Sequence, residues 1–234
     1  MTQTRPAGTL TSVRGIDDSG SMSSGTAVRG LDRTGAQAAL VRRITSIATR
    51  AVPGNEGAHL CFINQGGMFK NLSPAEIDAK AQAPAKGGTA LGENLRSKIL
   101  KPMVYDVIDS GKPLARPLLI LTITDGCPNT QDTFGKAIRE CGEYLVNKGY
   151  QKAGLFGILA YVAWQRVLFR LIGVPFAVVR FDLSQIGNDG SAAAFLQSLI
   201  DDKDISDVLH CTAGKSMLYL AELGDTMHEL NMKE

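Results

Sequence analysis

Residues 118–124, LLILTIT, form a short and almost uninterrupted apolar run, and an Asp-Gly pair follows it directly. A short apolar run that is bounded by turn residues is typical of a strand buried on both faces. Such strands belong to parallel sheets, which helices cover on both sides. The run therefore predicts a central strand of an α/β domain, with Asp125 and Gly126 in the loop at its carboxyl end.

Strand-like and helical segments alternate along the rest of the chain. The order predicts an α/β fold with a doubly wound, mostly parallel sheet and helices on both faces. We expect a disordered segment at 1–8, followed by a single domain at 9–234. Strands are predicted at 8–16, 58–64, 118–124 and 205–212, a strand with its exit loop at 176–189, and a hairpin at 65–71. Helices are predicted at 35–52, 73–82, 133–150, 191–202 and 214–234, and residues 84–108 are predicted to be a Gly loop that runs into a helix. The first strand is the weakest of these predictions, because Arg14 interrupts it.

The apolar segment at 153–175 does not fit this alternation. It has the length of a membrane span, but Gln165, Arg166 and Arg170 interrupt it, and charges near the centre of a bilayer are costly. We therefore predict no membrane span. The segment is expected to be an extra helix that is buried or faces a partner, or an addition from an imperfect gene model. If it were inserted into the domain, it could displace the strand that begins at residue 176 from the sheet.

Charge and cysteine content narrow the class of protein. The net charge is +2 for 234 residues, and the Lys and Arg residues form no stripe, so we expect no nucleic-acid partner. The four cysteines form no C-x-x-C pair, and the first residues have no apolar core of a secretory signal. These features predict reduced thiols in a cytoplasmic or nuclear protein that is not secreted.

Three loops carry oxygen side chains of the kind that bind hard cations. The first holds Asp17, Ser19 and Ser21, the second ends at Thr89, and the third begins with Asp125. In an open parallel sheet, ligands bind beyond the carboxyl ends of the strands. Carboxylates and hydroxyls suit Mg²⁺, and the set contains no Cys or His that would favour zinc or copper.

The motifs DDSGS (17–21), GGTALG (87–92) and TITDG (122–126) together resemble the von Willebrand factor type A (vWA) domain with its metal-ion-dependent adhesion site. The chain is most similar to stand-alone vWA domains of fungal proteins. The resemblance implies that Ser19 and Ser21 ligate Mg²⁺ or Mn²⁺ directly, and that Asp17 and Asp125 bind it largely through water. Thr89 would bind directly or through water, depending on the conformational state. It also implies a protein partner whose Glu or Asp carboxylate completes the coordination.

The same residues have purely structural explanations. Asp17, Ser19 and Ser21 could cap the next helix or form an Asx turn, Thr89 could be a helix N-cap, and Asp125 could belong to a turn. Asp18 occupies the variable position of the motif and is expected to lie in solvent. The three histidines share no motif and are expected to be packed or surface residues.

Three functions follow from these patterns. The main prediction is a metal-dependent protein-binding module that is not an enzyme. The alternative is a metal-free scaffold for protein assembly. A metal-assisted phosphohydrolase that uses Asp17 is a weaker alternative, because that chemistry needs a second carboxylate two residues later, where this chain has Ser19.

Overall fold

The computed structural model describes residues 11–23, 26–28, 31–33, 35–42, 58–81, 84–114, 117–150, 179–187 and 189–212. The strands are β1 (Thr11–Ile16), β2 (Thr26–Val28), β3 (Leu31–Asp32), β4 (Ala58–Phe62), β5 (Met68–Leu72), β6 (Leu118–Thr124), β7 (Val179–Gln185) and β8 (Leu209–Thr212). The helices are η1 (Gly20–Ser23), α2 (Pro74–Ala81), α3 (Leu91–Asn94), η2 (Leu95–Tyr105), α4 (Asp106–Asp109), α5 (Asp132–Asn147) and α7 (Gly190–Ile200). Residues 35–42 are also helical. The predicted disordered segment 1–8, the apolar segment 153–175 and the predicted helix 214–234 lie outside the described residues.

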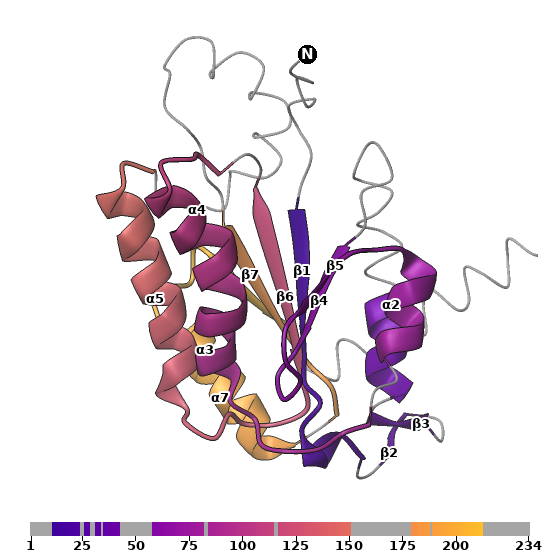
Figure 1. Ribbon diagram of the computed structural model, residues 1–234. Coiled ribbons are helices and arrows are strands. Elements are labelled where there is room, and N and C mark those ends of the chain that lie inside the picture. Colours follow the sequence, from indigo (N-terminus) through magenta and orange to yellow (C-terminus); the bar gives the residue numbers. More distant parts are fainter. Residues whose placement is uncertain are drawn as a thin grey trace, which may run out of the picture.

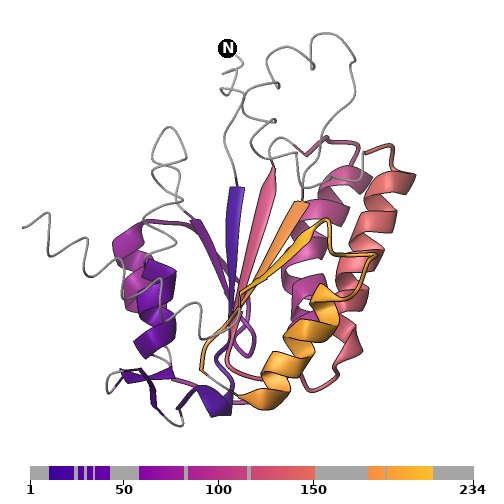
Figure 2. The same cartoon turned by 180° about the vertical axis from the view of Figure 1, so that it is seen from behind.

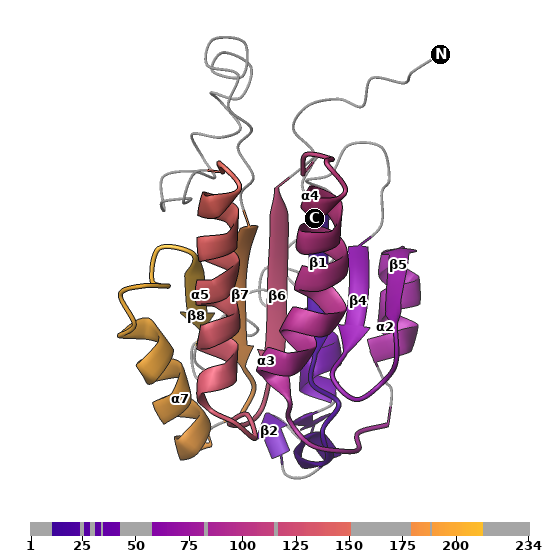
Figure 3. The same ribbon diagram turned by 60° about the vertical axis from the view of Figure 1, so that its left-hand side comes forward.

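Six strands form one sheet in the order β5-β4-β1-β6-β7-β8 (Figure 1). Each neighbouring pair is parallel except β4 and β5, which form the predicted hairpin at one edge. The strands β2 and β3 pair separately as an antiparallel ribbon. Figure 3 shows α3 and α5 in front of the sheet, and Figure 2 shows α7 (orange) beside one edge and α2 (purple) beside the other. The predicted α/β fold class is confirmed.

Each face of the sheet has its own apolar core. On one face, α3, η2, α5 and α7 enclose a cluster that includes Ile120, Phe134 and Leu183. On the other face, α2 and the helical residues 35–42 cover a smaller cluster that includes Ile16 and Ile123. The side chains of β6 therefore point alternately into the two cores, which explains why this strand is almost entirely apolar.

The weak first strand lies in the middle of the sheet. β1 pairs with both β4 and β6, and its residue Ile16 is in register with Phe62 and Ile123. Arg14 is fully buried, and its Nη1 donates to Ser12 Oγ at 3.1 Å. Within the described part of the chain, its Nε and Nη2 have no hydrogen-bond partner. Burial lowers the pKa of Arg14 to about 10. Tertiary position, rather than local composition, makes this segment a strand.

The strand that follows the apolar segment is part of the sheet. β7 is paired with β6 from Val179 to Gln185 and also with β8, so the sheet is intact on this side. Among the described residues, none of the helices is both long enough and apolar enough to cross a membrane. None of the four cysteines forms a disulfide with another described residue.

Helix boundaries follow local sequence signals where those signals are strong. α2 begins with a reciprocal capping box, in which the Ser73 backbone N–H donates to Glu76 Oε2 at 2.8 Å and the Glu76 N–H donates to Ser73 Oγ at 3.3 Å. Residues 84–108 are a Gly-containing loop that runs into a helix, as predicted. The helix begins at Leu91, where Gly92 lies against α5.

Candidate metal centre

The three predicted loops meet at the carboxyl edge of the sheet, which is the end of β1 where η1 lies in Figure 1. The backbone N–H of Asp17 donates to Ile123 O at 3.0 Å, so the first loop leaves the sheet beside β6. The Gly20 N–H donates to Gly87 O at 3.0 Å, and the Lys86 N–H donates to Asp18 O at 2.6 Å. These backbone bonds hold the loop of Thr89 against the loop of Asp17.

Four of the five candidate ligands form one hydrogen-bonded chain. The Ser19 backbone N–H donates to Asp17 Oδ1 at 2.8 Å. The hydroxyls of Ser19 and Ser21 are 3.0 Å apart, and Ser21 Oγ donates to Asp125 Oδ1 at 2.9 Å. The structure therefore brings together residues that are more than a hundred positions apart in the sequence, as the sheet order requires.

Thr89 lies in the adjoining loop. It is buried, and its backbone pairs with Asn129: the Thr89 N–H donates to Asn129 Oδ1 at 3.1 Å, and the Asn129 N–H donates to Thr89 O at 3.0 Å. Among the described residues, no hydrogen bond joins the Thr89 hydroxyl to the other four candidates. Thr89 is thus fixed through its backbone, which leaves its side-chain oxygen available to a ligand.

The two carboxylates are fully buried. Burial raises the pKa of Asp17 above its ordinary value, and the nearby charge of Asp125 adds to this shift. Hydrogen bonds oppose it, among them the one from Thr124 Oγ1 to Asp17 Oδ2 at 2.5 Å. A buried carboxylate with a raised pKa favours a nearby positive charge.

Asp18 is not solvated, so the prediction for this residue was wrong. Its side chain is 3% exposed. Asp18 Oδ1 accepts hydrogen bonds from the backbone N–H of Asn64 at 2.7 Å and from Asn64 Nδ2 at 3.2 Å, and Oδ2 accepts one from Gln65 Nε2 at 3.2 Å. Asp18 therefore anchors the loop of Asp17 to the loop that follows β4.

Lys98, which lies on η2, supports the loop that follows β4. Its Nζ donates to the backbone oxygens of Phe62, Ile63 and Gln65 at 2.9, 2.5 and 2.8 Å. The side chain thus fixes the chain just after β4, where Asn64 and Gln65 hold Asp18. Asp18 occupies the variable position of the first motif and Lys98 lies outside all three motifs, so only the tertiary structure reveals their roles.

Arg33 is a further residue that the sequence motifs did not identify. Its Nη1 donates to Asp125 Oδ2 at 2.6 Å, and its side chain is 21% exposed. Asp125 therefore uses both oxygens, one for the hydroxyl of Ser21 and one for a guanidinium. No local pattern around Arg33 predicts this contact, because it joins the start of the segment 33–42 to the end of β6.

The donor set fits a hard divalent cation. Two buried carboxylates and neighbouring hydroxyls supply only oxygen, which Mg²⁺ and Mn²⁺ prefer. The described residues contain no group of three or more His, Cys, Asp or Glu side chains that could hold a metal ion. Any metal held here would therefore depend on the hydroxyls of Ser19, Ser21 and Thr89 in addition to the carboxylates.

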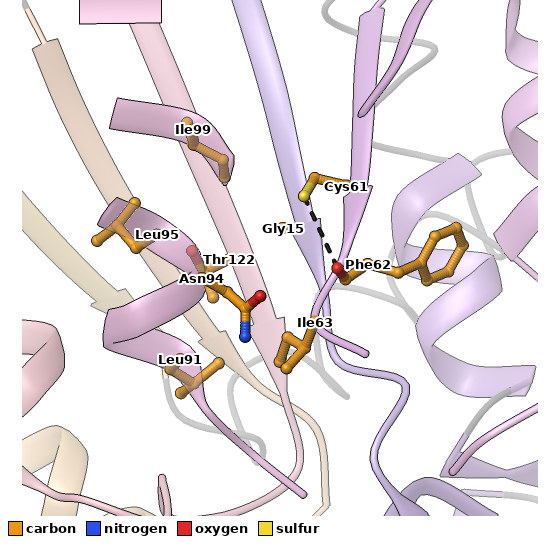
Figure 4. Close-up of a pocket in the computed structure, with 9 residues that line it drawn as sticks. All are labelled: Gly15, Cys61, Phe62, Ile63, Leu91, Asn94, Leu95, Ile99 and Thr122. Atoms are coloured by element: carbon orange, nitrogen blue, oxygen red, sulfur yellow. Dashed lines mark hydrogen bonds between the residues drawn. The ribbon is translucent and has the colours of Figure 1, made fainter. Parts of the chain in front are cut away.

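A small cavity lies next to the site, between β1 and the helix formed by α3 and η2 (Figure 4). Its volume is about 20 Å³, which is room for roughly one water molecule. Cys61 lines it, with its Sγ donating weakly to Phe62 O at 3.8 Å, and burial raises the pKa of this thiol to about 11. The cavity is too small for an organic substrate, and its thiol stays protonated at neutral pH.

No protein-family model and no curated protein matches the sequence. Among solved structures, the chain is similar to the manganese-loaded TRAP protein of Plasmodium vivax, with 13% identity, a TM-score of 0.48, and coverage of 91% of this chain and 72% of that chain. It is also similar to a point mutant of the PilB minor pilin from Streptococcus sanguinis, with 12% identity, a TM-score of 0.46, and coverage of 95% and 62%. A third similar structure is proximal thread matrix protein 1 from the mussel byssus, with 14% identity, a TM-score of 0.41, and coverage of 92% and 45%. The likeness is one of arrangement, and the assignment of the fold rests on the order and direction of the strands.

Proposed function

We propose that this chain is a metal-dependent protein-binding module. Asp17, Ser19, Ser21, Thr89 and Asp125 would hold Mg²⁺ or Mn²⁺, and the site would bind a Glu or Asp carboxylate of a protein partner. The observation that carries the proposal is the meeting of two fully buried carboxylates with a cluster of hydroxyls at the carboxyl edge of the sheet. Buried carboxylates this close together call for a cation.

The position of Ser21 supports binding to a partner at the surface. Ser21 is exposed, whereas Asp17, Asp125 and the other two hydroxyl residues are buried, so the site opens to solvent at Ser21. A bound divalent ion would supply positive charge on that side. Neutral hydroxyls as direct ligands would leave much of that charge unneutralised, and an acidic side chain of a partner would then be favoured over a neutral one.

We propose binding rather than catalysis because Ser19 occupies the position where phosphotransferase chemistry based on Asp17 would need a second carboxylate. The near-neutral net charge of +2 favours a protein partner over nucleic acid. Free thiols support a location in the cytoplasm or nucleus.

One observation favours a second candidate, a metal-free scaffold. The guanidinium of Arg33 already contacts Asp125 and supplies positive charge to the site. In that case the ion pair would neutralise the buried carboxylate permanently, and the edge loops would serve assembly without an ion.

Calorimetric titration of the full chain with Mg²⁺ and with Mn²⁺ separates the two candidates. We expect saturable binding that is lost in the double variant Asp17→Ala/Ser19→Ala. The matched control is Asp204→Ala/Ser206→Ala, which changes the same residue types at the same spacing in an exposed turn. Absence of binding to the folded native chain would favour the scaffold.

The acidic partner is tested with a pair of fluorescent peptides that differ only by Glu or Gln at one position. We expect the Glu peptide to bind more tightly when Mg²⁺ is present and to lose this advantage in a chelator. Equal binding of the two peptides with Mg²⁺ present would contradict direct coordination of a partner carboxylate.

A further inference from the structure

Arg33 and the proposed metal ion need the same carboxylate. Arg33 Nη1 lies 2.6 Å from Asp125 Oδ2, and Asp125 is fully buried. The remaining oxygen, Oδ1, accepts the hydroxyl of Ser21 at 2.9 Å. With Arg33 in place, both oxygens of Asp125 are in use, so coordination of an ion by Asp125 requires rearrangement of at least one of these contacts.

The side chain of Arg33 is held in position by the loop after β7. A Cβ atom built on Gly187 would lie 3.5 Å from Arg33 Nε and 3.9 Å from Cζ, so the guanidinium passes directly over this glycine. Gly187 has a φ of 86°, a conformation that L side chains rarely adopt. The loop thus lies within van der Waals reach of the Arg33 side chain, and its positive φ at position 187 favours glycine.

A second carboxylate lies close enough to feel the charge of Arg33. The pKa of Asp189 is lowered mainly by its hydrogen bonds from Ser191 and Ala192, and in smaller part by Arg33. Asp189 caps α7, accepting from the Ala192 N–H at 2.9 Å. A displaced Arg33 would therefore remain near an anion, which lowers the cost of leaving Asp125.

We propose that Arg33 is a built-in counter-cation that competes with the divalent ion for Asp125, so that ion binding displaces its guanidinium. The inference rests on the proposed function. Without an ion, Arg33 neutralises the buried carboxylate and closes the site. When the ion binds, the two positive charges repel each other and Arg33 moves away from Asp125. Metal binding therefore changes the position of the segment that carries Arg33.

The competition sets the metal affinity. If Arg33 contacts Asp125 in about nine-tenths of the ion-free molecules, only about one-tenth of the molecules can bind the ion. The apparent affinity for the ion is then reduced about tenfold. Arg33→Gln, which removes the charge, is therefore expected to bind Mn²⁺ about tenfold more tightly than the native chain. Arg42→Gln removes the same charge from an exposed position of the helical residues 35–42 and is expected to change the affinity by less than about twofold.

Thermal unfolding gives a second readout that does not depend on ligand titration. In a chelator, Arg33→Gln should melt at a lower temperature than the native chain, because Asp125 loses its counter-charge. Saturating Mn²⁺ should raise its melting temperature by more than it raises that of the native chain. If Arg33→Gln does not fold, Arg33→Lys keeps the charge without the planar fork and should show a smaller gain in affinity.

The outcomes distinguish the two proposals. Tighter binding by Arg33→Gln, including binding by this variant alone, supports the counter-cation. Equal or weaker binding by Arg33→Gln, with clear binding by the native chain, overturns it and leaves the metal-dependent module standing. Absence of binding by both chains overturns both proposals, and Arg33 is then a permanent partner of Asp125.

Discussion

Replacement of Asp18 by alanine tests whether this residue anchors the candidate metal centre. The carboxylate accepts three hydrogen bonds from Asn64 and Gln65, and the shortest, at 2.7 Å, comes from a backbone N–H. A hydrogen bond to a charged group contributes about 1.5–3 kcal/mol. The two longer bonds come from side-chain amides, which water can satisfy in part. We therefore expect Asp18→Ala to lower the free energy of unfolding by about 3 kcal/mol.

Urea unfolding of the metal-free chain measures this loss. A change of that size corresponds to a fall in melting temperature of about 6–12 °C for a chain of this length. Asp204→Ala is the matched control, since it removes the same group from an exposed turn, and should stay within about 0.5 kcal/mol of the native chain. Because the Asp18 side chain joins two loops of the site, we also expect the Mg²⁺ affinity to fall by at least about tenfold. A loss below about 0.5 kcal/mol for Asp18→Ala would refute the anchoring role.

Three further predictions concern other parts of the structure. The pKa of Asp17 is raised in the folded chain, so the metal-free protein should lose stability as the pH rises from about 3.8 through the folded pKa. Asp17→Asn should remove this loss. Identical pH profiles of the variant and the native chain in urea unfolding would contradict the prediction. Gly92→Ala should lower the free energy of unfolding by about 2–3 kcal/mol in the same assay, because its Cβ would lie 2.3 Å from the backbone of Thr133. Gly142→Ala, whose Cβ would have nothing within 4 Å, should instead stabilise α5 by about 0.5–1 kcal/mol. Arg14→Met should raise the free energy of unfolding by about 1–2 kcal/mol, since an apolar side chain replaces a buried guanidinium of which two nitrogens have no hydrogen-bond partner among the described residues. A lower stability would show that the charge is satisfied in the folded chain.

The fold could be predicted from the sequence because the strongest patterns lie on its central elements. The apolar run 118–124 becomes β6, which is buried between two cores, and the capping signal at Ser73 starts α2. The strand containing Arg14 was harder to predict, because its composition is that of an edge strand and its position is central. Local patterns indicate elements, but the order of strands in the sheet decides which of them are buried.

The candidate site was only partly predictable for the same reason. Asp17, Ser19, Ser21 and Asp125 follow strands that are neighbours in the sheet, so the topology brings them together. The roles of Asp18 and Arg33 depend on partners in other parts of the chain, and the local sequence around each residue does not predict those contacts. Asp18 lies between two predicted ligands, and its burial follows from its contact with the loop after β4, which the local sequence does not indicate.

The central position of β1 affects how the chain folds during synthesis. β1 is completed early, but its partner β6 comes much later, since Ile16 is paired with Ile123. At a translation rate of ~5–20 residues per second, β1 waits roughly 5–20 s for this neighbour. Parallel pairing over such a separation is slow, and the open edge of β1 is exposed to other chains meanwhile. A nascent chain that is released before β6 emerges would keep this edge open and be prone to aggregation.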